Sequence, residues 1–176
     1  MIELIREGSF PEISSDIDIL LNQAYCTSIL LRYIYSYQQA SITSLNSGMP
    51  YLLTYLCLPL TLHAPTREEI NKHMTSYGFH RFIGSHPTTL VYLAERVQDL
   101  VPLTRESLLF GATHGLLKIN QEMALVTTTS QVVRQATALL QHETEAMQPM
   151  RAASRLGLWF SQLTVAEIFF YLGLYP

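Results

Sequence analysis

The chain has 176 residues, of which 48% are hydrophobic and only 14% are charged, and its formal net charge is −3. A typical soluble domain carries about 25% charged residues, so this chain can bury a large core and still leave apolar surface. The composition excludes intrinsic disorder, collagen-like repeats and a disulfide-stapled mini-protein. A negative net charge without any Lys/Arg run argues against a protein that mainly grips nucleic acid by itself.

The length predicts a single domain over residues 1–176. The first 18 residues hold five acidic side chains and one arginine, so residues 1–16 are predicted to form an acidic arm that is either solvated or docked on a basic partner surface. Acidic residues follow Met1, and no basic segment precedes an apolar run. The first residues therefore lack the pattern of a signal peptide, and we predict a cytoplasmic protein.

Two apolar helices are predicted in the first half of the chain. Residues 14–16 offer N-caps for the first helix, whose apolar residues cover more than one face. Gly48 and Pro50 separate it from a second helix over residues 51–62, in which Pro59 predicts a kink or the last turn.

A charge-free stretch over residues 33–66 tests the membrane alternative. Its most apolar part, residues 49–62, contains two prolines and is shorter than the roughly 20 residues that cross a bilayer. We therefore predict a buried core helix. Thr66 and Glu69 form the pattern of a capping box for a third helix starting at Arg67, and residues 75–87 predict a connecting loop or strand.

The second half predicts two helices joined by a four-residue turn. An apolar stripe over residues 90–101 ends at Pro102. Thr104 is a candidate N-cap for the next helix, residues 105–115.

A β-hairpin is predicted to follow, with strands at residues 116–119 and 123–126. The resulting order over residues 88–127 is that of a winged helix, which often reads DNA. Apolar residues dominate the candidate recognition helix, however, and only Arg105 near its start could reach a phosphate or a guanine edge. The module is better explained as core or as a protein-docking surface.

Residues 130–173 predict C-terminal helices. One covers residues 131–147 and another residues 150–162. Thr164 and Glu167 form a capping box for the last helix. The predicted fold class is therefore mainly α: a compact multi-helix domain with a short β-hairpin and a winged-helix-like order in the middle.

Local basic residues are candidates for contacts with a DNA backbone. One cluster is interleaved with aromatic side chains, a combination used on nucleic-acid backbones, and another pair lies four residues apart on one predicted helix face. Solvated side chains are the simpler interpretation of both. The candidates are Arg67, Lys72, Arg81, Arg105, Lys118, Arg151 and Arg155.

Surplus aromatic residues are candidates for a protein interface, because Tyr and Trp are enriched at the centres of interfaces. A single large core could equally absorb them. The candidates are Tyr33, Tyr35, Tyr37, Tyr77, Phe79, Phe82, Trp159, Phe160 and Phe169.

No motif of an active site, a metal site or a cofactor site is present. The chain contains no GxSxG elbow, P-loop, GxGxxG or HExxH pattern. Cys26 and Cys57 have no CxxC partner, so both are predicted to be buried, reduced thiols. We expect no catalytic residue, no bound metal and no cofactor.

Short motifs occur in order along the chain: Asn22-Gln23-Ala24-Tyr25-Cys26, Leu58-Pro59-Leu60, Leu62-His63, Pro65-Thr66-Arg67, Thr104-Arg105-Glu106, Phe110-Gly111, His114-Gly115-Leu116-Leu117, Leu156-Gly157-Leu158-Trp159-Phe160 and Leu172-Gly173. Together they resemble the middle component of bacterial three-component ABC systems, almost from end to end. That group includes the small subunit of Lamassu-type defence systems, and the chain is similar to that subunit.

The resemblance implies a non-catalytic adaptor in defence against phages or plasmids. Its partners would be a coiled-coil ABC ATPase of the SMC and Rad50 type, which senses foreign DNA, and an effector, often a nuclease, that stays inactive until released. The adaptor would sit at the ATPase heads. It would itself bind no ATP, meet DNA mainly through the complex and not enter a membrane.

Two other classes of function stay open. A DNA-binding winged-helix regulator predicts salt-dependent binding of duplex DNA by the chain alone. An enzyme predicts turnover that survives removal of all partners.

Overall fold

The protein is described here by a computed structural model that covers residues 22–40, 48–138 and 145–174. As predicted, it is mainly helical with a small antiparallel sheet. The predicted acidic arm, residues 1–16, lies outside the described residues. The elements are, in chain order, α2 (Gln23–Ala40), β1 (Met49–Pro50), η1 (Tyr51–Leu53), α3 (Thr54–Thr61), α4 (Ala64–Lys72), η2 (Thr75–Tyr77), α5 (Phe79–Ser85), η3 (Pro87–Leu90), α6 (Leu93–Thr113), β2 (Lys118–Asn120), β3 (Leu125–Thr127), α7 (Ser130–Ala138), α8 (Met147–Phe160) and α9 (Val165–Leu172).

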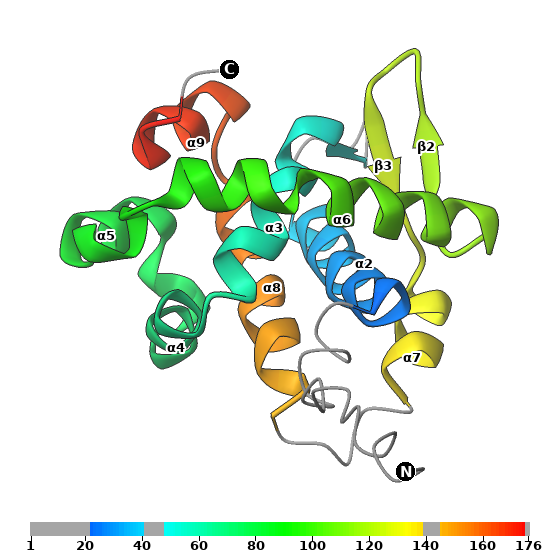
Figure 1. The fold of residues 1–176 in the computed structure, drawn as a ribbon, viewed down its shortest axis with the longest axis horizontal. Coiled ribbons are helices and arrows are strands. Elements are labelled where there is room, and N and C mark those ends of the chain that lie inside the picture. The colour runs from blue at the N-terminus through cyan, green and yellow to red at the C-terminus, as the bar shows by residue number, and fades with distance from the viewer. Residues whose placement is uncertain (1–21, 41–47, 139–144, 175–176) are drawn as a thin grey trace, which may run out of the picture.

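Helix α2 is the central element of the fold (Figure 1). It packs against α8, α6, α3 and α7, and between Tyr25 and Ile34 every side chain except Arg32 is buried. A helix that is apolar on all sides has to be covered on all sides, so the prediction of a first helix buried on several faces is confirmed.

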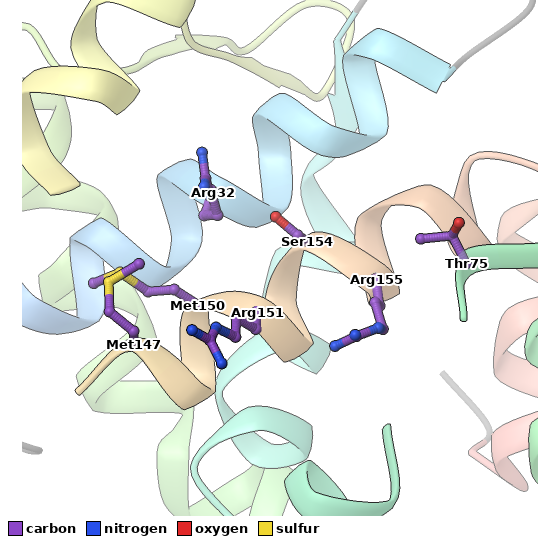
Figure 2. A pocket seen from close by; sticks show the side chains of 7 residues that line it. All are labelled: Arg32, Thr75, Met147, Met150, Arg151, Ser154 and Arg155. Atoms are coloured by element: carbon purple, nitrogen blue, oxygen red, sulfur yellow. The ribbon is translucent and has the colours of Figure 1, made fainter. Parts of the chain in front are cut away.

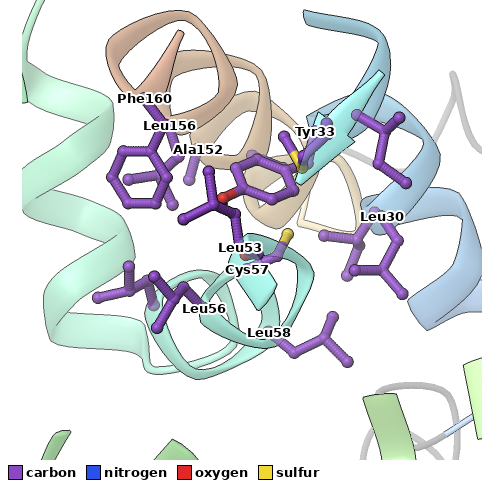
Figure 3. Packing of buried hydrophobic residues seen from close by; sticks show 14 of the residues in the cluster. Leu30, Tyr33, Leu53, Leu56, Cys57, Leu58, Ala152, Leu156 and Phe160 are labelled. Atoms are coloured by element: carbon purple, nitrogen blue, oxygen red, sulfur yellow. Dashed lines mark hydrogen bonds between the residues drawn. The ribbon is translucent and has the colours of Figure 1, made fainter. Parts of the chain in front are cut away.

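The core centres on Tyr33 of α2 (Figure 3). Its ring packs edge-to-face on Phe160 of α8, with ring centroids 6.0 Å apart. Its hydroxyl donates a hydrogen bond to the Leu53 carbonyl oxygen over 3.0 Å. A buried tyrosine hydroxyl needs such a partner, so Tyr33 fixes α2, α8 and η1 relative to one another.

Gly157 allows α8 to approach α2 closely. A Cβ atom at this position would overlap the Tyr33 carbonyl oxygen and would lie 3.0 Å from the backbone nitrogen of Tyr37. One turn earlier on α8, Ser154 contacts Ser36 of α2 through a hydroxyl hydrogen bond of 3.1 Å. Helices this close require a residue without a side chain at the crossing point.

Arg96 joins α6 to the segments before it. Its guanidinium donates hydrogen bonds to the carbonyl oxygens of Thr89 (2.8 Å), Val91 (3.3 Å) and Pro59 (3.3 Å). Partial burial lowers the pKa of Arg96, but a guanidinium keeps its charge in proteins. Arg96 therefore satisfies polar backbone groups of α3 and η3 that would otherwise be costly to bury.

The predicted hairpin is confirmed, and β1 adds a third strand to it. The strand order is β1-β3-β2, with both pairs antiparallel. Val126 in the middle strand is paired with Met49 of β1 and with Ile119 of β2. Strand β1 comes from the first half of the chain, shortly before α3, and the hairpin from the second half. Their pairing therefore joins the two halves of the chain.

The predicted turn between two helices at Pro102 is wrong. Helix α6 continues from Leu93 to Thr113 with Pro102 inside it, so residues 88–127 have no helix-turn-helix order. A proline removes one backbone hydrogen bond from a helix. After Pro102, the buried side of α6 contacts α2. Thr27 Oγ1 of α2 donates a hydrogen bond of 2.8 Å to the Ser107 carbonyl oxygen of α6.

Other local predictions met with mixed results. The segment 75–87 is helical, with η2, α5 and η3, and is neither a loop nor a strand. Helix α4 starts at Ala64 with His63 as its N-cap, so Thr66 and Glu69 form no capping box. The capping box of Thr164 and Glu167 is confirmed at the start of α9.

The C-terminal helices are shifted relative to the prediction. Helix α7 ends at Ala138 among the described residues, and Met147 already belongs to α8. The predicted continuation of the helix through residues 139–144 lies outside the described residues. Within the described part, no helix combines the length and the apolar character needed to cross a bilayer.

Both cysteines are buried, reduced thiols, as predicted. Burial raises the pKa of Cys26 to about 11. It also raises the pKa of Cys57, which is fully enclosed.

Replacing Gly157 by alanine tests the close approach of α8 and α2. We expect Gly157→Ala to lower the free energy of unfolding by about 1–3 kcal/mol, because the added methyl group has no room. Alanine otherwise favours a helix over glycine by about 1 kcal/mol. The matched control is Gly84→Ala in α5, where an added Cβ atom meets nothing within 4 Å. Urea unfolding measures both, and equal effects would contradict the argument.

The cysteines predict a fall in stability at alkaline pH. In the unfolded chain thiols ionise above about pH 8.5, whereas native Cys26 stays protonated until about pH 11. Above pH 8.5 the unfolded state therefore binds fewer protons, and the free energy of unfolding decreases as pH rises through this window. Urea midpoints between pH 8 and 10 measure it, with Cys26→Ala as the comparison. Rapid iodoacetamide labelling of the native chain near pH 7 would contradict the enclosed, protonated state.

Candidate functional site

A pocket of about 250 Å³ lies between α2 and α8. Figure 2 shows Arg32 on α2 and Arg151 and Arg155 on α8, the two helices that flank it. Met147, Met150, Ser154 and Thr75 complete the lining. The pocket thus combines three guanidinium groups with two thioether side chains and two hydroxyls.

The local sequence explains why these arginines meet. Arg151 and Arg155 are one helical turn apart on α8, so their side chains share one face. Arg32 is the only side chain between Tyr25 and Ile34 that is not buried, because it lies where α2 borders this pocket. The close approach at Gly157 brings the two helices together, so arginines from both helices line one pocket.

The positive charge of the pocket has no opposite charge beside it within the described residues. Across the described residues, the pairs of oppositely charged side chains all involve Glu69, which does not line the pocket. None of them includes Arg32, Arg151 or Arg155. Arg155 donates a hydrogen bond of 2.7 Å to Asn71 Oδ1, a neutral acceptor. Burial lowers the pKa of Arg155, and the charge of Arg151 lowers it further.

Such a pocket suits an anion. Guanidinium groups match carboxylate and phosphate oxygens in geometry as well as in charge. The flanking methionines offer an adaptable apolar surface beside the charges. An acidic side chain of a partner protein or a phosphate of a nucleic acid would therefore fit.

The structure positions the pocket firmly through α4 and Trp159. Asn71 of α4 donates hydrogen bonds of 3.0 Å to the backbone oxygen and to Oε1 of Gln148 on α8. Trp159 Nε1 donates a hydrogen bond of 2.8 Å to the carbonyl oxygen of Thr75, which lines the pocket.

Sequence reasoning found part of this site. The spacing of Arg151 and Arg155 indicated a shared face, and the structure confirms that both line one pocket. Arg32 was missed, because it is far away in the sequence. A useful signal was available: Arg32 interrupts an otherwise apolar helix and immediately precedes the charge-free stretch.

The other predicted basic residues are not brought together in one surface. Arg67 donates hydrogen bonds to the Thr61 and Leu62 carbonyl oxygens and so caps the end of α3. Lys72 pairs with Glu69 at 2.6 Å. Arg81 lies over the Tyr77 ring, 5.3 Å from its centroid.

Each of these three residues therefore has a local structural partner, which gives a sufficient reason for its position. Arg105 on α6 and Lys118 on β2 are exposed. Their contact with a DNA backbone stays a prediction.

The predicted aromatic interface is wrong for five residues, because the structure buries them in the core. Their side chains are at most 2% exposed, and a side chain enclosed in its own chain cannot form a contact surface. These are Tyr33, Phe79, Phe82, Trp159 and Phe160. The remaining candidates are partly buried and stay predictions: Tyr35, Tyr37, Tyr77 and Phe169.

A second cluster of polar side chains was not anticipated. Glu69, His73 and His86 bring three potential metal-ligand atoms within 4.8 Å of one another. Burial lowers the pKa of His73, and His86 lowers it further. The hydrogen bond from Lys72 lowers the pKa of Glu69. The four-residue spacing of Glu69 and His73 was a usable signal, but nothing local pointed to His86.

Comparison with known proteins identifies one family. The family model described as "ABC-three component (ABC-3C) system Middle Component 3" matches residues 11–176. No curated protein and no solved structure matches the chain.

The arginine pocket predicts stabilisation by a polyanion. At low ionic strength we expect inorganic tripolyphosphate to raise Tm by roughly 2–4 °C, the shift that about 1 kcal/mol of linked binding gives a chain of this size. The double variant Arg32→Gln with Arg151→Gln should lose most of this shift. Arg105→Gln with Lys118→Gln removes the same charge elsewhere and should keep it. Thermal unfolding of the parent chain and of both double variants measures the shift. If both double variants lose it equally, tripolyphosphate binds by nonspecific charge attraction.

Proposed function

Because the chain belongs to the Middle Component 3 family of ABC-three component systems, we propose that it is a non-catalytic adaptor subunit of a bacterial defence complex. It docks on a coiled-coil ABC ATPase of the SMC and Rad50 type. It helps couple the sensing of foreign DNA to the control of an effector nuclease, in a system of the Lamassu type. The observation that carries this proposal is a family match that includes every described helix and strand.

The arginine pocket is the surface proposed to meet the partner. Three cations without a carboxylate beside them in the described residues favour an acidic segment of the ATPase or of the effector. Arginine is enriched at interface centres, because its planar group forms several directed hydrogen bonds at once. Exposed Phe170 on α9, at 76% exposure, offers an apolar contact outside the pocket.

The proposal assigns no chemistry to this chain. Ser154 is a hydroxyl in the pocket, but its hydrogen-bond partner is Ser36, and the described residues that line the pocket include no histidine or carboxylate. A nucleophilic serine needs a base beside it. In the complex, ATP is bound by the ATPase and DNA is met mainly through it, and the complex acts in the cytoplasm.

The regulator alternative loses its main support. A helix-turn-helix reader presents the start of a separate recognition helix to the major groove. Here Arg105 lies in the middle of the continuous helix α6, so the predicted recognition helix does not exist as a separate element. The hairpin with Lys118 remains, and a backbone contact through it is compatible with an adaptor.

Co-purification with the ATPase tests the adaptor proposal. We expect the chain to co-elute in gel filtration with the ATPase of its own system after nuclease treatment. Arg32→Glu with Arg151→Glu should weaken capture by roughly tenfold or more, since opposed charges at a docking site become like charges. The matched control, Arg105→Glu with Lys118→Glu, has the same net charge and should bind normally.

The outcomes separate the candidate functions. A monodisperse chain that ignores the co-expressed ATPase would overturn the adaptor proposal. Salt-dependent binding of duplex DNA by the isolated chain, lost in the Arg105 and Lys118 variant, would favour the regulator instead. Loss of ATPase capture only in that control variant would place the docking surface at Arg105 of α6 or Lys118 of the hairpin.

A further inference from the structure

The cluster of Glu69, His73 and His86 shares no residue with the lining of the arginine pocket and lies where α4 meets the end of α5. Glu69 lies in the last turn of α4, and His73 is the C-cap residue that directly follows this helix; their potential ligand atoms lie within 4.8 Å of each other. His86 is the C-cap of α5. Its backbone N–H donates hydrogen bonds to the Phe82 and Ile83 carbonyl oxygens, which fixes it at that helix end.

One ring nitrogen of His73 lacks a hydrogen-bond partner within the described part of the chain. Its Nε2 is buried and has no hydrogen-bond partner among the described residues. The imidazole is held in place by stacking on Tyr77, with centroids 4.0 Å apart and planes 11° apart, and by edge contact with Phe82. A buried ring nitrogen without a partner costs about 1–3 kcal/mol, so a ligand for this atom would remove a cost that the fold otherwise bears.

His86 is oriented as metal-binding histidines are. Its Nδ1 lies 3.1 Å from the Phe82 carbonyl oxygen, which can only accept a hydrogen bond. Nδ1 therefore carries the proton, and in the neutral ring this leaves a lone pair on Nε2. A hydrogen bond from the second nitrogen to a carbonyl oxygen is the usual support for a ligating imidazole.

The spacing of the first two ligand atoms already suits a tetrahedral ion. His86 Nε2 and Glu69 Oε2 are 3.3 Å apart, and two ligands at about 2.0–2.1 Å from a tetrahedral zinc ion lie about 3.3 Å from each other. The other oxygen, Oε1, is held by Lys72 Nζ at 2.6 Å. The ligand atoms of all three residues lie within 4.8 Å of one another, so their separations would have to shorten by at most about 1.5 Å to meet this geometry.

We propose that Glu69, His73 and His86 bind a zinc ion that links α4 to the end of α5, with water at the fourth position. Two imidazole nitrogens and one carboxylate favour Zn²⁺ over Mg²⁺ and Ca²⁺, which prefer oxygen ligands. The Glu69 and His86 side chains are 30% and 21% exposed, so an ion can enter from solvent. Zinc here would stabilise the α4–α5 corner and not supply a reaction.

Zinc titration of the full chain tests this proposal. The protein is purified without a histidine tag, treated with EDTA and freed of chelator. We expect isothermal titration calorimetry to show one zinc ion per chain. Tm should rise by roughly 5–10 °C at a free concentration about 100 times Kd, and Mg²⁺ should give no such shift. Co²⁺ in place of Zn²⁺ should give the visible absorption of a tetrahedral site.

Variants assign the ligands. Glu69→Gln keeps the side-chain shape and should weaken zinc binding by about 100-fold or more, beyond the roughly 10- to 100-fold that loss of an outer hydrogen-bond partner costs. His73→Ala and His86→Ala should do the same. The control is His80→Ala, because His80 is exposed on α5 and its ring packs on Tyr171, outside the cluster.

Each outcome bears on the proposal. Zinc binding that is lost in the three variants and kept in His80→Ala supports it. Absence of binding to the parent chain overturns it and leaves Glu69 and His86 as a polar side-chain contact only. Binding that persists in Glu69→Gln and in both histidine variants also overturns it, because the ion would then be held elsewhere.

Discussion

The close approach of α8 to α2 at Gly157 is the constraint on which the rest of the structure depends. With no Cβ atom between them, the α8 backbone lies against the Tyr33 carbonyl oxygen, and the Tyr33 ring can reach both Phe160 and η1. The same approach sets the distance between the two helix surfaces at the rim. Arg32 therefore lines the same pocket as the arginines of α8, so a packing requirement in the core also produces the cationic pocket.

Polar groups inside this apolar chain are satisfied by a few long side chains. Arg96 supplies donors to carbonyl oxygens of α3 and η3, and Arg67 does so at the end of α3. Arg67 directly follows the charge-free stretch in the sequence, and Arg96 reaches that stretch through its hydrogen bond to Pro59. The low charge content is thus explained in part by a large core, which absorbs five of the nine predicted interface aromatics. In a chain with so few charged residues, arginines without an ion-pair partner among the described residues are stronger candidates for a docking surface.

Local patterns predicted elements well where no distant contact competed with them. The box of Thr164 and Glu167 forms as expected, whereas Thr66 and Glu69, with the same spacing, do not form one. Thr66 is turned to His63, at 2.8 Å, and Glu69 pairs with Lys72 and His86. Likewise Pro102 looked like a helix end, but α6 continues through it, and the core holds Leu93 before it and Leu108 after it. The candidate sites follow the same division: spacing indicated a shared face for Arg151 and Arg155, but neither Arg32 nor His86 could be joined to its cluster without the tertiary fold.

Helix α4 physically connects the two candidate sites. Asn71 contacts α8 and accepts the hydrogen bond from Arg155, while Glu69 and His73, two residues to either side, face the end of α5. The chain then continues from His73 to Thr75, which lines the arginine pocket and is held by Trp159. Because Asn71 lies between Glu69 and His73 at the end of α4, an ion bound by these two residues would also restrain Asn71 and, through its hydrogen bond, the Arg155 guanidinium. Ordering of the α4–α5 corner would thereby reduce the side-chain entropy lost when an acidic partner enters the pocket.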